Sequence, residues 1–248
     1  MRIFNKAVRC IIMNGIAALV VASHLYAEGF PQGPPPGMTP PQKPSDLRDA
    51  ATPAIETIGP GMFRMGEILI NKKFQSVSFP AQVNMDKGLL EYLLVRTGGK
   101  THESLLRTHI QPVDIHLACL LLGLEGTDRP LRVQGDPERP KGEPMEIRMI
   151  INRDGKNANI RPEEWLSKKT GAVSEGVEKL DWVFTGSVIF NRRFMAQVEG
   201  SLVALYRDPV ALFDNASPGG ESDRIWFVKE GAVPAVGTPV TLIIMRKK

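Results

Sequence analysis

The chain has 248 residues, a formal net charge of +4 and two cysteines. Residues 1–27 hold three of the 31 basic residues and none of the 27 acidic ones, so the remaining chain is nearly neutral. This balance excludes an electrostatic footprint for nucleic acid, and we expect no nucleic-acid partner. Outside residues 1–27 the one cysteine is Cys119, which excludes an internal disulfide and a four-thiolate iron–sulfur cluster.

Residues 1–27 are typical of a secretory signal peptide. Arg2, Lys6 and Arg9 form a positive segment, residues 11–22 form an apolar segment, and Ala27 precedes an acceptable cleavage point. The apolar segment is short for a membrane span. We therefore predict a secreted or periplasmic protein cleaved after Ala27. An uncleaved signal that anchors the chain to the membrane is the alternative.

Residues 28–66 are predicted to form a proline-rich spacer. Residues 28–45 contain seven prolines and three glycines, a composition that stays extended and buries little surface. Pro53 and Pro60 interrupt the rest of this segment. A docking peptide for a proline-reading partner is the alternative use. A single globular domain is predicted over residues 67–248.

Residues 88–126 are predicted to form the structural centre of this domain. Residues 89–95 are apolar at nearly every position, which indicates a central strand covered on both faces. Gly98-Gly99 fits a two-residue turn. The segment is therefore expected to form an antiparallel hairpin.

A helix is predicted to follow over residues 112–122. Pro112 suits its first position, Asp114 suits its first turn, and Gly123 suits the position after its end. Most other residues in the segment are apolar, so we expect a helix that is buried nearly all round. His116 and Cys119 share one of its sides.

Short strands dominate the rest of the predicted domain. Asp154-Gly155 is a strong hairpin-turn signal, and Pro162 with the two acidic residues after it starts a short helix. Strands are expected near residues 67–70, 72–79, 145–152, 157–160, 180–190, 194–200, 201–206, 225–228 and 240–245, with a helical turn at 210–213. The predicted fold class is α+β: a mainly antiparallel β-sheet with one buried helix at about 112–122 and short helical turns.

Two segments of the chain are faintly similar to one another. Residues 88–93 (GLLEYL) resemble residues 200–205 (GSLVAL), and each segment is followed by a helical segment that starts with proline. An internal duplication is a minor hypothesis on this ground.

A family resemblance rests on the central segment. The run GLLEYLLVRTGGKTHESLL, the Pro112 helix ending in LLLGLEG, and the later WVFTGS and EGSLVALYRDP resemble the YdjY-type domain of bacterial secreted proteins. The resemblance covers about residues 67–245 and rests mostly on Glu91, His102-Glu103-Ser104 and the apolar helix. It implies a compact extracytoplasmic domain. Some family members are described as similar to ferredoxins, but this chain departs from them because it lacks the cysteines for a cluster.

Glu91, His102 and Ser104 are the candidate catalytic residues. In the predicted hairpin they share one sheet face, where they could act as acid, base and nucleophile of a hydrolase. Strand alternation places Glu103 on the opposite face. His102 and Ser104 lie two residues apart on one strand, which separates their Cβ atoms by about 7 Å. No nucleophile-elbow motif is present, so hydrogen bonding within the sheet is the competing interpretation.

A metal site is a further hypothesis. His102, His109, His116 and Cys119 are of types that bind zinc, but their spacing matches no known zinc pattern. We expect no bound metal and no cofactor; Glu103 and His116 remain candidate binding residues. The acidic segment from Asp214 to Asp223 is expected to be a solvated loop rather than a calcium site. Trp165, Trp182 and Trp226 are expected to lie in the core.

The sequence therefore favours a non-catalytic secreted or periplasmic domain that binds a protein or a small ligand of the cell envelope. One alternative is a hydrolase or metal-dependent enzyme that uses the His102/Ser104/Glu91 or the His102/His116 cluster. A second alternative is a redox accessory protein without an iron–sulfur cluster of its own.

Overall fold

The computed structural model describes residues 52–153 and 155–247, so the predicted signal peptide and most of the predicted spacer lie outside the described residues. In the first half, the strands and helices are β1 (Ile55–Gly59), β2 (Met62–Met65), β3 (Ile68–Asn71), β4 (Ser76–Val83), β5 (Tyr92–Arg96), the 3-10 helix η1 (Thr101–Glu103), β6 (Ser104–Thr108), α1 (Pro112–Leu121), β7 (Glu143–Arg153) and β8 (Lys156–Ile160). In the second half, they are the 3-10 helix η2 (Pro162–Trp165), β9 (Leu166–Thr170), β10 (Val173–Gly176), β11 (Trp182–Phe184), β12 (Ile189–Phe190), β13 (Arg193–Phe194), α2 (Met195–Glu199), β14 (Ser201–Ala204), β15 (Phe213–Asn215), β16 (Trp226–Val228) and β17 (Pro239–Arg246).

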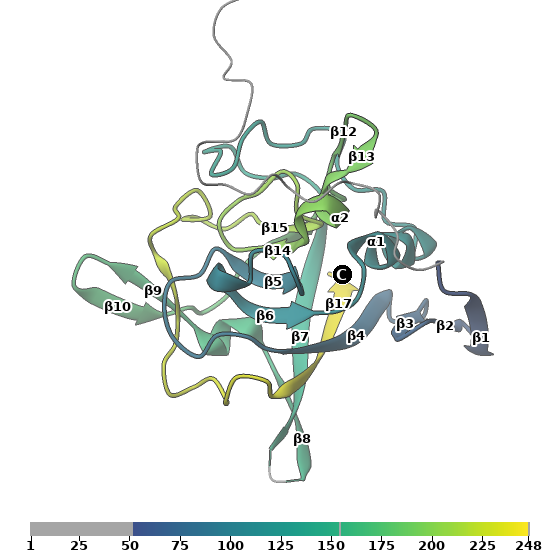
Figure 1. Cartoon of the computed structure of the whole chain (residues 1–248), viewed down its shortest axis with the longest axis horizontal. Helices are drawn as coiled ribbons and strands as arrows, with labels where there is room; N and C mark the ends of the chain where they lie inside the picture. The colour runs from purple at the N-terminus through teal and green to yellow at the C-terminus, as the bar shows by residue number, and fades with distance from the viewer. Residues whose placement is uncertain (1–51, 154, 248) are drawn as a thin grey trace, which may run out of the picture. The chain divides into compact units, whose positions relative to one another are not determined.

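Eight strands close into a barrel (Figure 1). Their order is β4-β17-β7-β11-β15-β14-β5-β6, and pairing of β6 with β4 completes the ring. Two neighbouring pairs, β5–β6 and β14–β15, are parallel, and the other six pairs are antiparallel. Strands β1 to β3 extend the sheet from β4, and β10-β9-β16 and β12-β13 form two smaller sheets.

Alternation along the long strands fills the interior. In β4 every second residue from Val77 to Val83 is buried, and β7 and β17 show the same period of two. Phe79 pairs with Leu242, which pairs in turn with Met149, so three buried side chains meet across neighbouring strands. All three tryptophans are also buried, as predicted.

The ring is two-fold symmetric in its strand order. Exchanging β4, β5, β6 and β7 for β11, β14, β15 and β17 leaves the order of neighbours unchanged. In each half a strand continues through a short connection into its own parallel neighbour: β5 into β6, and β14 into β15. This arrangement supports the hypothesis of an internal duplication.

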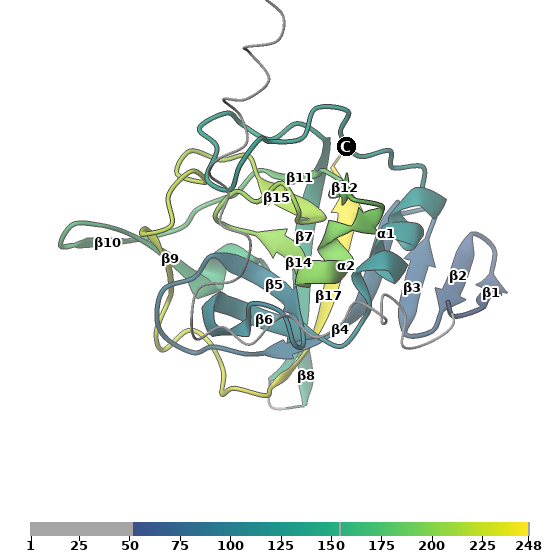
Figure 2. The same cartoon turned by 45° about the horizontal axis from the view of Figure 1, so that its top comes forward.

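The predicted α+β class is wrong, because the strands form a closed, mainly β barrel rather than an open sheet covered by a buried helix. Helix α1 occupies the predicted segment, but it lies outside the ring beside α2, β3 and β4 (Figures 1 and 2). Leu120 and Leu121 are 43% and 39% exposed, so the helix is not buried all round. A leucine-rich helix indicates burial but does not say which element covers each side.

The predicted central hairpin is also wrong. Strands β5 and β6 are parallel, with Tyr92 opposite Ser104, because the segment between them runs back along β5 and ends in η1. Gly99 lies where this connection passes Gly200, and a Cβ atom on Gly99 would be 2.9 Å from the Glu199 carbonyl oxygen. The glycine therefore permits a close crossing of backbones instead of a hairpin turn.

Other local predictions had mixed outcomes. The hairpin predicted from the Asp154-Gly155 signal is confirmed, because Arg153 pairs with Lys156 in the antiparallel pair β7–β8. The expected strand at 194–200 is mostly helix α2, and the expected helical turn at 210–213 leads into strand β15. In the described residues, no helix combines the length and apolar character needed to cross a membrane.

Candidate functional site

A polar cluster centred on Tyr92 lies where the two equivalent connections of the barrel meet. The Tyr92 hydroxyl donates to the Asp208 carboxylate at 2.6 Å and accepts from the Lys100 ammonium at 2.7 Å. The Gln134 amide also donates to it at 3.2 Å. Lys100 precedes η1 in the β5–β6 connection, and Asp208 lies in the β14–β15 connection. We call these four residues the Tyr92 cluster.

Charges within the Tyr92 cluster are balanced. The Lys100 ammonium lies 3.3 Å from Glu199 and 3.8 Å from Asp208, and 5.0 Å from the centre of the Tyr92 ring. Burial and the Asp208 carboxylate raise the pKa of Tyr92. The phenol therefore stays protonated and serves as a hydrogen-bond donor, not as a general base.

Glu91 lies at the half-exposed edge of this cluster. Its carboxylate accepts from the Gln134 amide at 3.2 Å, and its backbone N–H donates to the Glu103 carbonyl. Partial burial and the nearby Glu103 carboxylate raise the pKa of Glu91, while Lys100 opposes the shift. Glu91 and Glu103 thus lie near each other, although alternation along a hairpin predicted opposite faces for them.

The structure does not bring His102 and Ser104 together with Glu91 as a catalytic set. Ser104 is completely buried, and its hydroxyl donates to the Leu106 carbonyl at 2.7 Å. The His102 side chain is 77% exposed and lies 3.4 Å from Glu103. The 3-10 turn that precedes β6 replaces strand alternation here, which is why His102 meets Glu103.

Cys119 is a core residue of α1, and His116 is a half-buried residue of the same helix. The His116 ring lies between Phe184 and Phe194, at centroid distances of 5.9 and 4.9 Å, and burial lowers its pKa. Cys119 is fully buried, and burial followed by the Glu143 charge raises the pKa of its thiol. A protonated, inaccessible thiol is poorly suited to redox chemistry.

No group of three His, Cys, Asp or Glu side chains in the described part of the chain is placed to hold a metal ion. His109 is an exposed residue whose ring contacts the Glu67 carboxylate at 2.5 Å. The His102/His116 pairing is therefore not supported by the geometry.

A buried arginine, Arg207, holds the backbone of the loop next to the Tyr92 cluster. The Arg207 guanidinium donates to the carbonyls of Asp136, Pro137 and Ser217 at 3.0–3.1 Å. These bonds fix the loop that carries Gln134. The connection after β14 therefore helps to position the cluster, which sequence spacing did not indicate.

Asp214 is not part of a solvated loop as predicted. It is completely buried in β15, where its carboxylate accepts the backbone N–H groups of Asp208 and Asn215 at 3.1 and 2.8 Å. Burial raises its pKa to about 8 despite these hydrogen bonds. Asp214 therefore supports the backbone beside Asp208.

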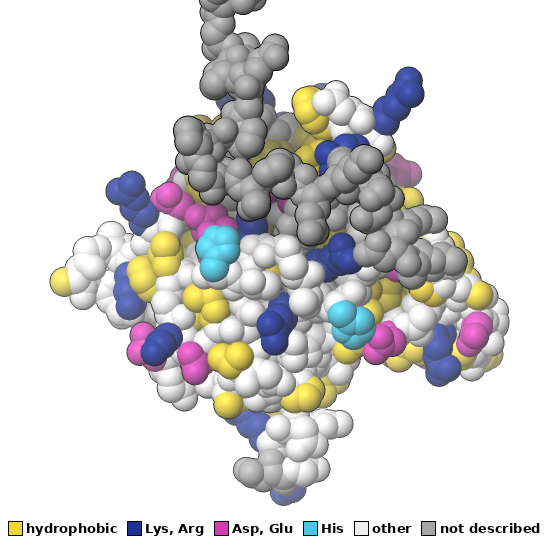
Figure 3. Space-filling view, in the orientation of Figure 1, with side chains coloured by type: hydrophobic (Ala, Val, Ile, Leu, Met, Phe, Trp, Pro, Cys, Tyr) yellow, Lys and Arg dark blue, Asp and Glu magenta, His cyan; other side chains and the backbone are white. Residues whose placement is uncertain are grey.

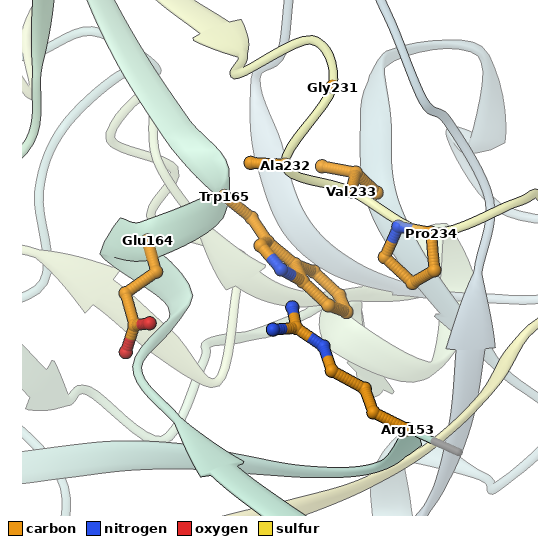
Figure 4. Close-up of a pocket in the computed structure, with 7 residues that line it drawn as sticks. All are labelled: Arg153, Glu164, Trp165, Gly231, Ala232, Val233 and Pro234. Atoms are coloured by element: carbon orange, nitrogen blue, oxygen red, sulfur yellow. The ribbon is translucent and has the colours of Figure 1, made fainter.

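A cavity of about 470 Å³ lies away from the cluster, at the end of β7. Arg153, Glu164, Trp165 and residues 231–234 line it (Figure 4). Trp165 is 1% exposed, and its indole Nε1 has no hydrogen-bond partner within residues 52–153 and 155–247. The sequence contained no signal for this site, because its walls come from three distant segments.

We compared the chain with known protein families. The family model of the YdjY domain matches residues 68–245, which is most of the chain and nearly all of the barrel. The chain belongs to the YdjY domain family. No curated protein and no solved structure matches it. The family resemblance carried by the central segment is thus confirmed, and both the Tyr92 cluster and the Arg153–Trp165 cavity lie within the YdjY domain.

Proposed function

We propose that this protein is a non-catalytic binding domain of the cell envelope that recognises a small ligand. The observation that carries the proposal is a contrast between two sites. Every charged group of the Tyr92 cluster has an internal partner. The lining of the cavity instead includes Trp165, whose buried indole N–H has no partner among the described residues.

The polar cluster supports a structural role. Its hydrogen bonds join the two symmetric connections, and the Tyr92 phenol is fully buried. A catalytic centre needs groups whose hydrogen bonds are completed by substrate or transition state. Here the Tyr92 bonds are completed by the protein, and the Ser104 hydroxyl is committed to a backbone carbonyl.

The surface charges and the N-terminal sequence support a location in the cell envelope. Acidic and basic side chains are interspersed on the face shown in Figure 3, which does not suit a polyanion such as nucleic acid. The signal-like residues 1–27 support export to the periplasm or the exterior, followed by a proline-rich spacer. Attachment to the membrane would require that the signal stays uncleaved.

The experiment combines a ligand screen with an activity screen on the purified protein. Small organic acids, amino acids, sugars and phosphate are tested for an increase in melting temperature, because a ligand of the native state stabilises it by mass action. Ester and phosphate-ester hydrolysis is measured in parallel. Stabilisation without turnover is the expected result. Turnover that disappears in Ser104→Ala or His102→Ala would refute the proposal in favour of a hydrolase.

A further inference from the structure

The walls of the Arg153–Trp165 cavity are fixed by backbone contacts. The Lys229 N–H donates to the Trp165 carbonyl at 2.8 Å, which holds the 229–234 loop against η2. The Glu164 carboxylate accepts the Arg161 N–H at 2.8 Å and so closes the first turn of η2. Trp165 is thereby held between a strand end and a loop, and the cavity is built by elements that do not depend on a ligand.

Two hydrogen-bond donors converge in this cavity without an acceptor. Figure 4 shows the Arg153 side chain reaching toward the indole ring of Trp165. The indole Nε1 is buried and unsatisfied. Within residues 52–153 and 155–247, the Arg153 guanidinium has no hydrogen-bond or ion-pair partner, and one carboxylate oxygen of Glu164, the acidic residue of the lining, accepts the Arg161 backbone N–H.

A buried donor without an acceptor destabilises the folded protein, because its lost hydrogen bonds to water are not replaced. An acceptor that bonds to this donor offsets that free energy. An anion suits this position better than a neutral carbonyl, because the second donor is a cation. A carboxylate has two oxygens, so that one can accept from the indole N–H and the other from the guanidinium. Arg153 is exposed and free to adjust to such a group.

Four residues of the lining offer apolar contacts to the body of a ligand. The Trp165 ring, Ala232, Val233 and Pro234 offer aromatic and aliphatic contacts, and Figure 4 shows Val233 and Pro234 on the side of the ring that faces the loop. A cavity of about 470 Å³ falls within the size range of small-molecule sites. We propose that the cavity binds a small monocarboxylate with an aromatic or aliphatic body, and this inference rests on the proposed binding function.

Phenylacetate is a suitable probe, and the indole N–H signals of the ¹⁵N-labelled protein report its position. We expect titration at neutral pH to shift the signal that is missing in Trp165→Phe. Phenylacetamide has nearly the same shape without the charge and is expected to bind at least about tenfold more weakly. Arg153→Gln is expected to weaken phenylacetate binding by a similar factor.

Lys156→Gln is the matched control. It removes one positive charge from the same hairpin, directly opposite Arg153, but Lys156 does not line the cavity. Affinity should change by less than about twofold, because an exposed charge outside the site is screened by salt. Since Arg153 is exposed, its variant keeps the experiment valid even if Trp165→Phe fails to fold.

Three outcomes would overturn the inference. In the first, phenylacetate moves no indole signal. In the second, the acid and the amide bind equally. In the third, the Trp182 signal moves instead, which would place the ligand in a second cavity of about 270 Å³ that Trp182 lines and where its indole Nε1 is also unpaired. If one of these outcomes occurs while another ligand stabilises wild type and Arg153→Gln alike, the site is refuted and the binding function is left intact.

Discussion

The hydroxyl of Tyr92 and the carboxylate of Asp208 form a 2.6 Å hydrogen bond between residues that are 116 positions apart in the chain. The bond joins β5 to the connection that follows β14, and Lys100 from the connection that follows β5 contacts both groups. The Tyr92–Asp208 bond therefore links the two symmetric halves of the barrel. Both groups are buried, and the Lys100 ammonium balances the charge of Asp208.

Replacing Tyr92 with phenylalanine should destabilise the fold. The substitution removes a buried donor to a carboxylate and also leaves the Lys100 and Gln134 donors without one acceptor. Buried hydrogen bonds to charged groups contribute about 1.5–3 kcal/mol. Denaturant unfolding should show a loss of this size.

Tyr206→Phe is the control for Tyr92→Phe. Tyr206 is partly buried near the same cluster, but its hydroxyl has no hydrogen bond to the described residues. Its loss should change the free energy of unfolding by less than about 0.5 kcal/mol. Equal effects of the two substitutions would contradict the linking role of Tyr92.

Asp214 should make stability fall with rising pH. Its ordinary pKa of 3.8 rises to about 8 in the folded protein, so between these values the folded state binds the proton more strongly than the unfolded state. Stability from this group is therefore complete below about pH 4 and is lost as pH rises toward 8. Melting temperatures across this range should decline less steeply in Asp214→Asn than in wild type.

Asp223→Asn provides the comparison for Asp214. The Asp223 side chain is 49% exposed and forms a surface ion pair with Arg224. Its replacement should leave the slope of stability against pH close to that of wild type. A parallel curve for Asp214→Asn would show that Asp214 is ionised at neutral pH in the folded protein.

His116 should have the opposite effect in acid. Burial lowers its pKa below the ordinary value of 6.5, so the unfolded chain takes up the proton first as pH falls. The stability that comes from neutral His116 is present above about pH 6.5 and is lost below it. In His116→Leu the loss of stability between pH 7 and pH 5 should be smaller. His102→Gln alters an exposed ring and should leave that loss unchanged.

Gly99→Ala should cost about 1–3 kcal/mol, because the added methyl group meets the Glu199 carbonyl oxygen and the Gly200 backbone. Gly176→Ala is the counterpart, since no atom lies within 4 Å of its added Cβ. That change should be neutral or stabilise by up to about 1 kcal/mol through reduced freedom of the unfolded chain. Chemical denaturation of both variants measures the difference. A harmless Gly99→Ala would mean that the β5–β6 connection does not pass close to the junction of α2 and β14.

The predictions from sequence succeeded where neighbouring residues carry the signal. Pro112 and the glycine after the last turn delimit α1, and Arg153 pairs with Lys156 across the predicted hairpin turn, because capping and turn chemistry act over a few residues. The candidate site was only partly found. Glu91 lies at the edge of the Tyr92 cluster, but Ser104 and His102 do not face it, because their predicted positions depended on a hairpin that does not form.

The sequence by itself determined the YdjY family, the burial of the three tryptophans and the position of α1, since composition and short motifs carry that information. The tertiary structure alone decided the closure of β6 on β4, the bond between Tyr92 and Asp208 and the meeting of Arg153 with Trp165 at one cavity. These features depend on contacts between distant segments, and a strand's own pattern specifies which face is buried without specifying its neighbour.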